Sequence, residues 1–232
     1  MQNSAQVQQI FRQIAPHYDR MNRLMTFGLD LTWRRKAVRR LKPLQPRKLL
    51  DLAAGTGDFA WIAAQELSSL QGVYLVDFVP EMLAYAEKRG SPRPGIAWHI
   101  CVADAHELPF DDAYFDVITV GYGVRNFTDR PRALREMYRV LRPGGIALVL
   151  ETGLPANPFW KAIFWLYFRA YVPLLGLFIA KARDAYTYLP ESTRHFPHRE
   201  KFLYLCREAG FTRSSYENFL GGVSILYILE KA

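Results

Sequence analysis

The chain has 232 residues, of which 50% are hydrophobic and 22% are charged, a globular composition that excludes a disordered chain. This length suffices for one large α/β domain, with or without added helices. Lysine and arginine outnumber the acidic residues by 30 to 22, and the net charge of +8 suits an anionic membrane, nucleic acid or an acidic ligand alike. Cys101 and Cys206 lie far apart and form no CxxC, which argues against a disulfide framework or a zinc site.

The N-terminus shows no basic-then-apolar order and no small-residue cleavage site, so we expect no signal or transit peptide and a cytoplasmic, bacterial protein. The longest apolar stretch, Phe159–Ala180, is interrupted by Lys161, Arg169 and Pro173. Its uncharged part, Ala170–Ala180, is shorter than the ~20 residues that a membrane-spanning helix needs. We therefore expect no transmembrane helix.

Apolar periodicity predicts helices in the first part of the chain and alternating strands and helices from Lys48 onward. The N-terminal helices are expected at Val7–Ile14, Tyr18–Phe27 and Leu31–Leu41, the last with Asp30 as its N-cap. Five strands are expected at residues 48–53, 72–77, 96–102, 114–120 and 146–151, with helices at 59–70, 80–89 and 130–141, the last closed by Arg142-Pro-Gly-Gly145. A helical, aromatic-rich insertion at 159–181, a helix at 199–209 and strands at 211–216 and 223–229 complete the chain.

This alternation predicts an α/β, Rossmann-like fold with a mostly parallel sheet, helices on both faces and an antiparallel pair of C-terminal strands. We predict two parts: an N-terminal helical cap at residues 1–45 and one domain at residues 46–232. Within that domain, a helical insertion at about 156–195 is predicted to form a lid over the substrate.

A glycine-rich loop, Asp51-Leu-Ala-Ala-Gly55-Thr56-Gly57-Asp58, follows the first predicted strand. Its glycines allow a sharp turn into a helix and let a ligand lie close to the backbone. The loop also satisfies G-x-G-x-x-A, the dinucleotide fingerprint. However, Asp51 suits a ligand that carries a sulfonium and an ammonium better than a pyrophosphate, which prefers bare amides at a helix N-terminus.

Two more carboxylates follow the next strands. Asp77, beside Phe78, ends the second strand, where it can accept from both hydroxyls of a ribose, and Asp104 follows the third, where it can accept from an adenine amino group. One aspartate at a strand end is usually a helix cap, but three at the carboxyl ends of consecutive parallel strands occupy the ligand-binding edge of such a sheet. We therefore predict a site for S-adenosylmethionine (SAM) built from Asp51, Gly55, Thr56, Gly57, Asp77, Phe78 and Asp104.

The sequence resembles the UbiE/MenG family of quinone C-methyltransferases, which have the class I SAM-dependent fold. The likeness covers nearly the whole chain and is carried by Asp51–Asp58, by Gly123-Val-Arg-Asn126, by Tyr138–Gly145, by Tyr188–Pro197 and by the leading signature within Phe11–Trp33. The first of these motifs is common to many methyltransferases, whereas the leading signature, the R-N motif and the Tyr188 block are more specific.

The resemblance implies that Thr56, Asp77, Asp104 and Ala105 contact SAM. A further family position, a serine in some members, falls on Gly121, where the hydroxyl is missing. The C-terminal segment, residues 220–231, lacks the common family ending and resembles the cyanobacterial branch that methylates the phylloquinone precursor.

The implied reaction is methylation of a ring carbon of 2-phytyl-1,4-naphthoquinol, or of a close prenylated analogue, in phylloquinone or menaquinone biosynthesis, with no metal. The quinol must be reduced, because an ionised hydroxyl pushes electron density onto the ring carbon, so the enzyme must align the reactants and remove a phenolic proton. We expect Arg125 to stabilise the developing phenolate, with a structural ion pair as its alternative role. Tyr122, Asn126, Tyr18 and His17 are weaker candidates for hydroxyl contacts.

Two segments bear on membrane contact. Aromatic residues within Phe159–Tyr171, together with Lys161 and Arg169, suit a membrane interface or an apolar channel. The basic run from Arg34 to Lys42 suits either attraction to anionic lipid or a solvated helical face. We expect peripheral contact with an anionic inner or thylakoid membrane and no nucleic-acid partner, and we predict no particular oligomeric state.

Alternative functions remain at this point. Methylation of a ubiquinone-type benzoquinol precursor would use the same site. An NAD(P)-binding oxidoreductase is supported by the fingerprint and Asp77, but the chain lacks a Tyr-x-x-x-Lys pair in a catalytic setting. A nucleic-acid methyltransferase would fit the basic charge, although no N-P-P-Y-type motif is present. A binding module without catalysis is the fourth alternative.

Overall fold

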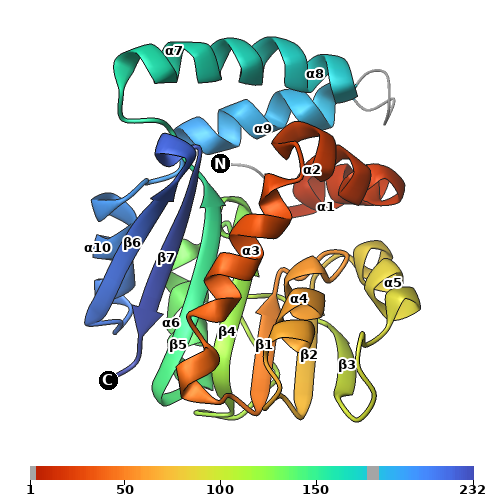
Figure 1. The fold of residues 1–232 in the computed structure, drawn as a ribbon, viewed down its shortest axis with the longest axis vertical. Helices are drawn as coiled ribbons and strands as arrows, with labels where there is room; N and C mark the ends of the chain where they lie inside the picture. Colours follow the sequence, from red (N-terminus) through yellow and green to blue (C-terminus); the bar gives the residue numbers. More distant parts are fainter. Residues whose placement is uncertain (1–3, 177–182) are drawn as a thin grey trace.

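The computed structural model describes residues 4–176 and 183–232, and a seven-stranded sheet with the order β3-β2-β1-β4-β5-β7-β6 forms its centre (Figure 1). The strands are β1 Lys48–Leu52, β2 Gly72–Asp77, β3 Ala97–Val102, β4 Phe115–Gly121, β5 Leu141–Thr152, β6 Arg213–Phe219 and β7 Ser224–Glu230. The first five are parallel, and β7 runs antiparallel to both β5 and β6. The predicted α/β class and the antiparallel C-terminal pair are confirmed.

Helices cover both faces of the sheet, and each face has its own buried cluster. The helices are α1 Ser4–Ile14, α2 Tyr18–Thr26, α3 Leu29–Arg39, α4 Asp58–Glu66, α5 Pro80–Arg89, α6 Arg130–Val140, α7 Pro158–Leu166, α8 Val172–Leu175, α9 Arg183–His195 and α10 Glu200–Glu208. Trp33 of α3, Ala60 of α4 and Leu83 of α5 belong to the cluster on one face. Leu134 of α6 and Phe202 of α10 belong to the cluster on the other. The central strand β1 is buried on both sides, which is why three of its five residues are leucine, and Asp51 is its one buried charged residue.

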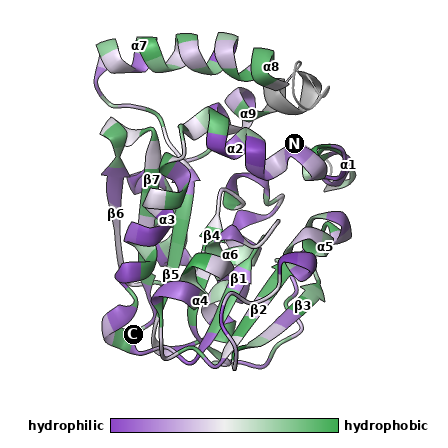
Figure 2. Cartoon of the chain, turned by 45° about the vertical axis from the view of Figure 1, so that its right-hand side comes forward, coloured by the Kyte–Doolittle hydropathy of each residue, from purple (hydrophilic) through white to green (hydrophobic). Residues whose placement is uncertain are grey.

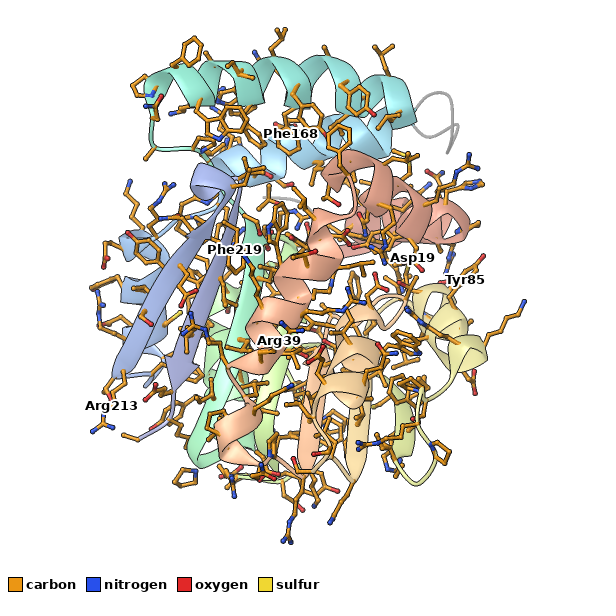
Figure 3. All side chains as sticks on the ribbon, viewed as in Figure 1. Asp19, Arg39, Tyr85, Phe168, Arg213 and Phe219 are labelled. Atoms are coloured by element: carbon orange, nitrogen blue, oxygen red, sulfur yellow. The ribbon has the colours of Figure 1, made fainter. Side chains whose placement is uncertain are left out.

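A second layer of helices lies beyond the carboxyl edge of the parallel strands. In Figure 1, α1 and α2 lie beside α9, with α7 and α8 above them. A π-helical turn, Tyr167–Tyr171, joins α7 to α8. Phe164, Phe168 and Val172 from this segment pack against Ile14 and Met21 of the N-terminal helices, and Figure 3 shows Phe168 beneath the α7 layer. The last residues of the predicted insertion, 177–181, lie outside the described residues.

The predicted boundaries of α3, α4 and β5 are wrong. Helix α3 begins at Leu29 after a left-handed Gly28, so Asp30 is a buried first-turn residue and not the N-cap. Helix α4 ends at Glu66, earlier than expected, because Leu67 adopts an extended conformation. The Arg142-Pro-Gly-Gly145 segment was expected as a closing turn but lies within β5, which begins directly after α6.

The C-terminal strands are shifted relative to the prediction. Strand β6 begins at Arg213, two residues late, because Phe211 is fully buried before the strand starts. Strand β7 begins one residue late, at Ser224, after a short turn at Leu220–Gly222. The pairing of β7 with β5 puts Glu151 opposite Ile225, so the end of β5 is held against the C-terminal strand.

Candidate active site

The site lies where the direction of the strand order reverses. Strand β1 pairs with β2 on one side and with β4 on the other. After β1 the chain adds β2 and β3 on the first side, and then crosses to the other side of β1 to add β4 and β5. At such a switch point the loops that leave neighbouring strands diverge and form a crevice beyond their carboxyl ends. The glycine loop after β1 borders this crevice, as do Gly121, the last residue of β4, and Tyr122, which follows it.

The glycine loop needs its glycines for conformation and for space. Gly55 and Gly57 have φ values of +57° and +80°, which L side chains rarely adopt. A Cβ on Gly57 would lie 2.8 Å from Leu75 Cδ2 and 3.1 Å from Ala86 Cβ, so this residue lets α4 start close against β2 and α5. Gly57 therefore serves the packing of the loop, and it lines none of the three cavities described next.

A cavity of about 430 Å³, which we call the loop cavity, is bordered by Gly55, Asp77, Phe78 and Gly121 of the predicted cofactor residues. The two oxygens of the Asp77 carboxylate accept hydrogen bonds from Gly55 N at 2.8 Å and from Val79 N at 2.9 Å. Burial raises the pKa of Asp77 to about 6. The carboxylate is thus fixed in position, and each oxygen keeps a further lone pair for a ligand.

A second, smaller cavity of about 280 Å³, the inner cavity, adjoins the first and is lined by Asp51, Thr56, Asp58 and Arg34. The carboxylate of Asp51 is buried and accepts from Thr119 Oγ1 at 2.8 Å and from Ala60 N at 2.9 Å. Thr56 Oγ1 donates to Asp19 Oδ1 at 2.5 Å. Asp19 lies where the N-terminal helices face α4 and α5 (Figure 3). Asp51 therefore holds β1, β4 and α4 together in addition to bordering the cavity.

We expect Asp51→Asn to stabilise the ligand-free protein at neutral pH. Burial raises the pKa of Asp51 from near 4 to about 7, so between these values the folded state holds a proton that the unfolded state has lost. The contribution of Asp51 to stability therefore falls as pH rises from 4 to 7, by at most about 1.4 kcal/mol per pH unit. Urea unfolding of both proteins at pH 5 and pH 8 tests this. The variant should gain stability at pH 8 and little at pH 5, and an equal change at both values would contradict it.

The third cavity, the apolar cavity, lies between the N-terminal helices and the α7–α8 segment. Its walls are mostly apolar and include Ile10 and Phe11 of α1 and Phe164 and Phe168 of the upper layer. Tyr18 borders all three cavities. A molecule in the apolar cavity can therefore meet a molecule in the other two at this side chain.

Polar side chains also line the apolar cavity, among them Asn22, Asp30 and Arg125. Arg125 lines it and is 8% exposed. Its Nη1 donates to Glu151 Oε1 at 2.8 Å, and its backbone N donates to Glu151 Oε2 at 3.1 Å. The ion pair considered from the sequence is present, and it also fixes the guanidinium at the cavity wall. Asn22, which the sequence analysis gave no role, has a buried Nδ2 without a hydrogen-bond partner among the described residues.

Tyr122 lies at the boundary between the loop cavity and the apolar cavity. Its φ of +60° is a left-handed conformation that costs a non-glycine residue energy, as often seen at functional sites. Its hydroxyl lies 3.2 Å from Ser224 Oγ, and burial raises its pKa. Burial also raises the pKa of Tyr18. Both hydroxyls thus stay protonated at neutral pH and can act as hydrogen-bond partners but not as bases.

The remaining predicted residues differ in whether they line one of the three cavities. Asn126 lines the loop cavity, whereas Asp104, Ala105 and His17 line none of the three cavities. The side chain of Asp104 is 63% exposed and bonds to His106. It follows β3, the strand next to β2, so its contact with an adenine group stays a prediction.

The basic run after Arg34 is mostly paired with the protein's own acids. Arg34 pairs with Asp30, Arg39 and Lys42 with Glu66, and Arg40 with Glu217. The structure thus favours the interpretation of this run as a packed and solvated helical face over attraction to lipid. The Asp30–Arg34 spacing, i to i+4 on one helix, is the sequence signal that could have indicated a buried pair.

Neither a metal centre nor a membrane span stands out in the described part of the chain. None of its His, Cys, Asp and Glu side chains form a group of three or more that could hold a metal ion. No helix within residues 4–176 and 183–232 is long and apolar enough to cross a membrane.

Comparison with known proteins identifies the family. Residues 1–231 match the ubiE/COQ5 methyltransferase family. The chain is 40% identical over 226 residues to the demethylmenaquinone methyltransferase of Deinococcus radiodurans, covering 97% of this chain and 92% of the relative. It is 41% identical over 219 residues to the enzyme of that name from Thermus thermophilus, covering 94% and 98%.

Solved structures agree on the fold. A SAM-dependent methyltransferase from Thermotoga maritima, described as a possible histamine N-methyltransferase, superposes with a TM-score of 0.66 at 21% identity, covering 97% of this chain and 99% of that one. A putative SAM-dependent methyltransferase from Methanococcus maripaludis gives 0.62 at 22% identity, covering 95% and 93%. The fold is that of class I SAM-dependent methyltransferases, and the chain belongs to the ubiE/COQ5 methyltransferase family as a SAM-dependent enzyme.

Proposed function

We propose that this enzyme methylates a ring carbon of a prenylated naphthoquinol, with 2-phytyl-1,4-naphthoquinol as its substrate. The observation that carries this proposal is the apolar cavity, which meets the loop cavity at Phe11, Tyr18 and Tyr122. The relatives from Deinococcus and Thermus are demethylmenaquinone methyltransferases by name, which supports a naphthoquinol ring.

The residues at the glycine loop fit SAM. The ionised Asp77 carboxylate suits two ribose hydroxyls, and Gly55 lets the ligand approach the backbone closely. When bound, SAM supplies an electrophilic methyl group on its sulfonium. Membership of a methyltransferase family removes the support for the NAD(P) alternative, although the fingerprint G-x-G-x-x-A is present.

The chain's own task is to orient the ring and to stabilise its negative charge. Arg125 lies at the wall of the apolar cavity, and Glu151 fixes it in place. A cation in this buried position would stabilise the phenolate that must form before the ring carbon attacks. Asn22 Nδ2 provides a further donor that a quinol oxygen can satisfy.

The alternative substrate is a ubiquinone-type benzoquinol. Comparing the kcat/KM values of a naphthoquinol and a benzoquinol distinguishes the two proposals. With SAM and reduced substrates that carry the same phytyl tail, we expect a higher kcat/KM for the naphthoquinol than for the benzoquinol. With the naphthoquinol ring fixed, a phytyl tail should give a higher kcat/KM than a long polyprenyl tail. A preference for the benzoquinol would overturn the proposed ring, and a preference for the polyprenyl tail would overturn only the proposed tail.

We also propose that α7 and α8 lie on an anionic membrane surface, from which the lid and cap helices admit the quinol. The inner side of this segment lines the apolar cavity, yet its outer side is apolar too, with Phe159 and Leu166 exposed by 76% and 72%. Figure 2 shows hydrophobic segments along α7 and α8 at the outer edge of the molecule. No acidic residue occurs from Thr152 to Arg183, whereas Lys161 and Arg169 lie on this segment. Exposed apolar and basic side chains together match an anionic bilayer interface.

Vesicle flotation tests this surface. We expect Phe159→Ser combined with Leu166→Ser to weaken binding to anionic vesicles at least tenfold, since each inserted apolar side chain contributes about 1.5–3 kcal/mol. Tyr204→Ser is the matched control, because Tyr204 is 57% exposed on α10, away from this segment. Arg39→Gln is a control for charge on the α3 run. Equal loss in the control variants, or binding that does not depend on anionic lipid, would contradict the proposal.

A further inference from the structure

A buried cation faces the inner cavity with a nitrogen that makes no hydrogen bond. Arg34 of α3 is 3% exposed, and its Nη1 donates to Asp30 Oδ2 at 2.7 Å. Its Nε is buried and has no partner among the described residues. A buried guanidinium N–H without an acceptor is costly, so such an atom points to an acceptor that a ligand brings.

The other polar side chains of this cavity are already engaged. Both carboxylate oxygens of Asp51 accept hydrogen bonds from within the sheet and α4. Those of Asp58 accept from Arg23 at 2.5 Å and from Arg89 at 2.8 Å, and Thr56 donates to Asp19. Within the described lining of the inner cavity, Arg34 Nε is thus the buried side-chain atom that still needs a partner.

The guanidinium lies beside the passage between the two cavities at the glycine loop. A Cβ on Gly121 would lie 3.7 Å from both Nε and Nη2 of Arg34. Gly121 borders the loop cavity as well as the inner cavity. A ligand whose ribose is held by Asp77 can therefore extend past Gly121 and place its other end at Arg34.

We propose that Arg34 binds the carboxylate of the methionyl group of SAM. Arginine is a donor only and stays charged, so its partner must be an acceptor and preferably an anion. The carboxylate is the one anionic group of SAM, whereas the ammonium and the sulfonium would be repelled. This assignment orients the cofactor, with the ribose at Asp77 and the amino-acid end beneath α3. It rests on SAM dependence and not on the identity of the methyl acceptor.

Calorimetry with SAM and with decarboxylated SAM, in which hydrogen replaces the carboxylate, isolates this contact. We expect the wild-type protein to bind SAM at least about tenfold more tightly than decarboxylated SAM. Arg34→Gln should weaken SAM binding roughly ten- to hundredfold and leave decarboxylated SAM nearly unchanged, because a hydrogen bond to a charged group is lost only with the first ligand. The ratio of the two affinities should then approach one.

Two further variants separate this role from a structural one. Thr26→Val removes another partner of Asp30, since Thr26 Oγ1 donates to Asp30 Oδ1 at 2.8 Å, and Thr26 does not line the inner cavity, so this variant should keep the wild-type ratio of affinities. Arg34→Lys keeps the charge but lacks Nε, and it should lower the ratio even if the glutamine variant fails to fold. The proposal is overturned if wild-type protein binds both ligands equally, or if both Arg34 variants weaken the two ligands by the same factor.

Discussion

Removing the charge of Arg125 together with that of Glu151, by Arg125→Gln with Glu151→Gln, should lower kcat about a hundredfold or more and leave the SAM affinity within about threefold of wild type. The ion pair is buried, with Arg125 Nη1 2.8 Å from Glu151 Oε1 at the wall of the apolar cavity. Loss of one preorganised stabilising group typically costs ~10²–10³ in kcat. Steady-state assays with a reduced naphthoquinol and calorimetry with SAM give the two quantities.

The double variant is more informative than Arg125→Ala alone. Removing only the cation leaves Glu151 buried and unpaired, which typically destabilises a protein by about 3–5 kcal/mol and would confuse a catalytic loss with misfolding. Arg40→Gln with Glu217→Gln removes an exposed ion pair elsewhere and should keep wild-type turnover. If the Arg125 and Glu151 double variant also turned over at a near-normal rate, Arg125 would be purely structural.

Asp77→Asn is expected to weaken SAM binding about a hundredfold. The carboxylate is held by the backbone N–H groups of Gly55 and Val79 at the border of the loop cavity, so it presents fixed acceptors to a ribose. Two charge-assisted hydrogen bonds, each worth about 1.5–3 kcal/mol, would be replaced by weaker neutral ones. Asp104→Asn is the matched control, because that side chain is 63% exposed and bonds to His106. We expect at most a tenfold loss there.

The same carboxylate predicts a pH dependence of cofactor affinity. Burial raises the pKa of Asp77 to about 6 in the ligand-free protein, and the ribose contacts require the ionised form. SAM affinity should therefore fall as pH decreases below 6, by up to tenfold per pH unit, and this part of the dependence should vanish in Asp77→Asn. A wild-type affinity that is constant from pH 5 to pH 8, or an Asp77→Asn variant that binds SAM within threefold of wild type, would contradict the assigned role.

The sheet was predictable because its strands carry their own signals. The leucines of β1, followed by the glycine loop, and the acidic residues Asp51 and Asp77, near or at the ends of β1 and β2, mark parallel strands and their ligand-binding edge. The boundaries failed where tertiary packing overrides local pattern. Phe211 is buried before β6 begins. Asp30 is buried within the first turn of α3, where it pairs with Arg23 and Arg34.

The site was only partly predictable for a related reason. Sequence places Asp77, Gly55 and Gly121 near one another, since all lie at the same edge of the sheet. It cannot show that Asn22 and Arg34 each keep a buried nitrogen without a partner, because that depends on how α2 and α3 pack against the glycine loop and α4. For the same reason the basic run looked continuous in sequence, whereas in the fold most of its side chains meet acids from distant elements.

The most direct test of the proposed function is methyl transfer from isotopically labelled SAM to a phytylated naphthoquinone that lacks the ring methyl, in its reduced and oxidised forms. The product is identified by mass spectrometry and by the position of the label on the ring. We predict one labelled methyl on the ring carbon of the reduced substrate and none on the oxidised one. Transfer to oxygen, equal transfer to both forms, or no transfer to any reduced naphthoquinol would contradict the proposed reaction.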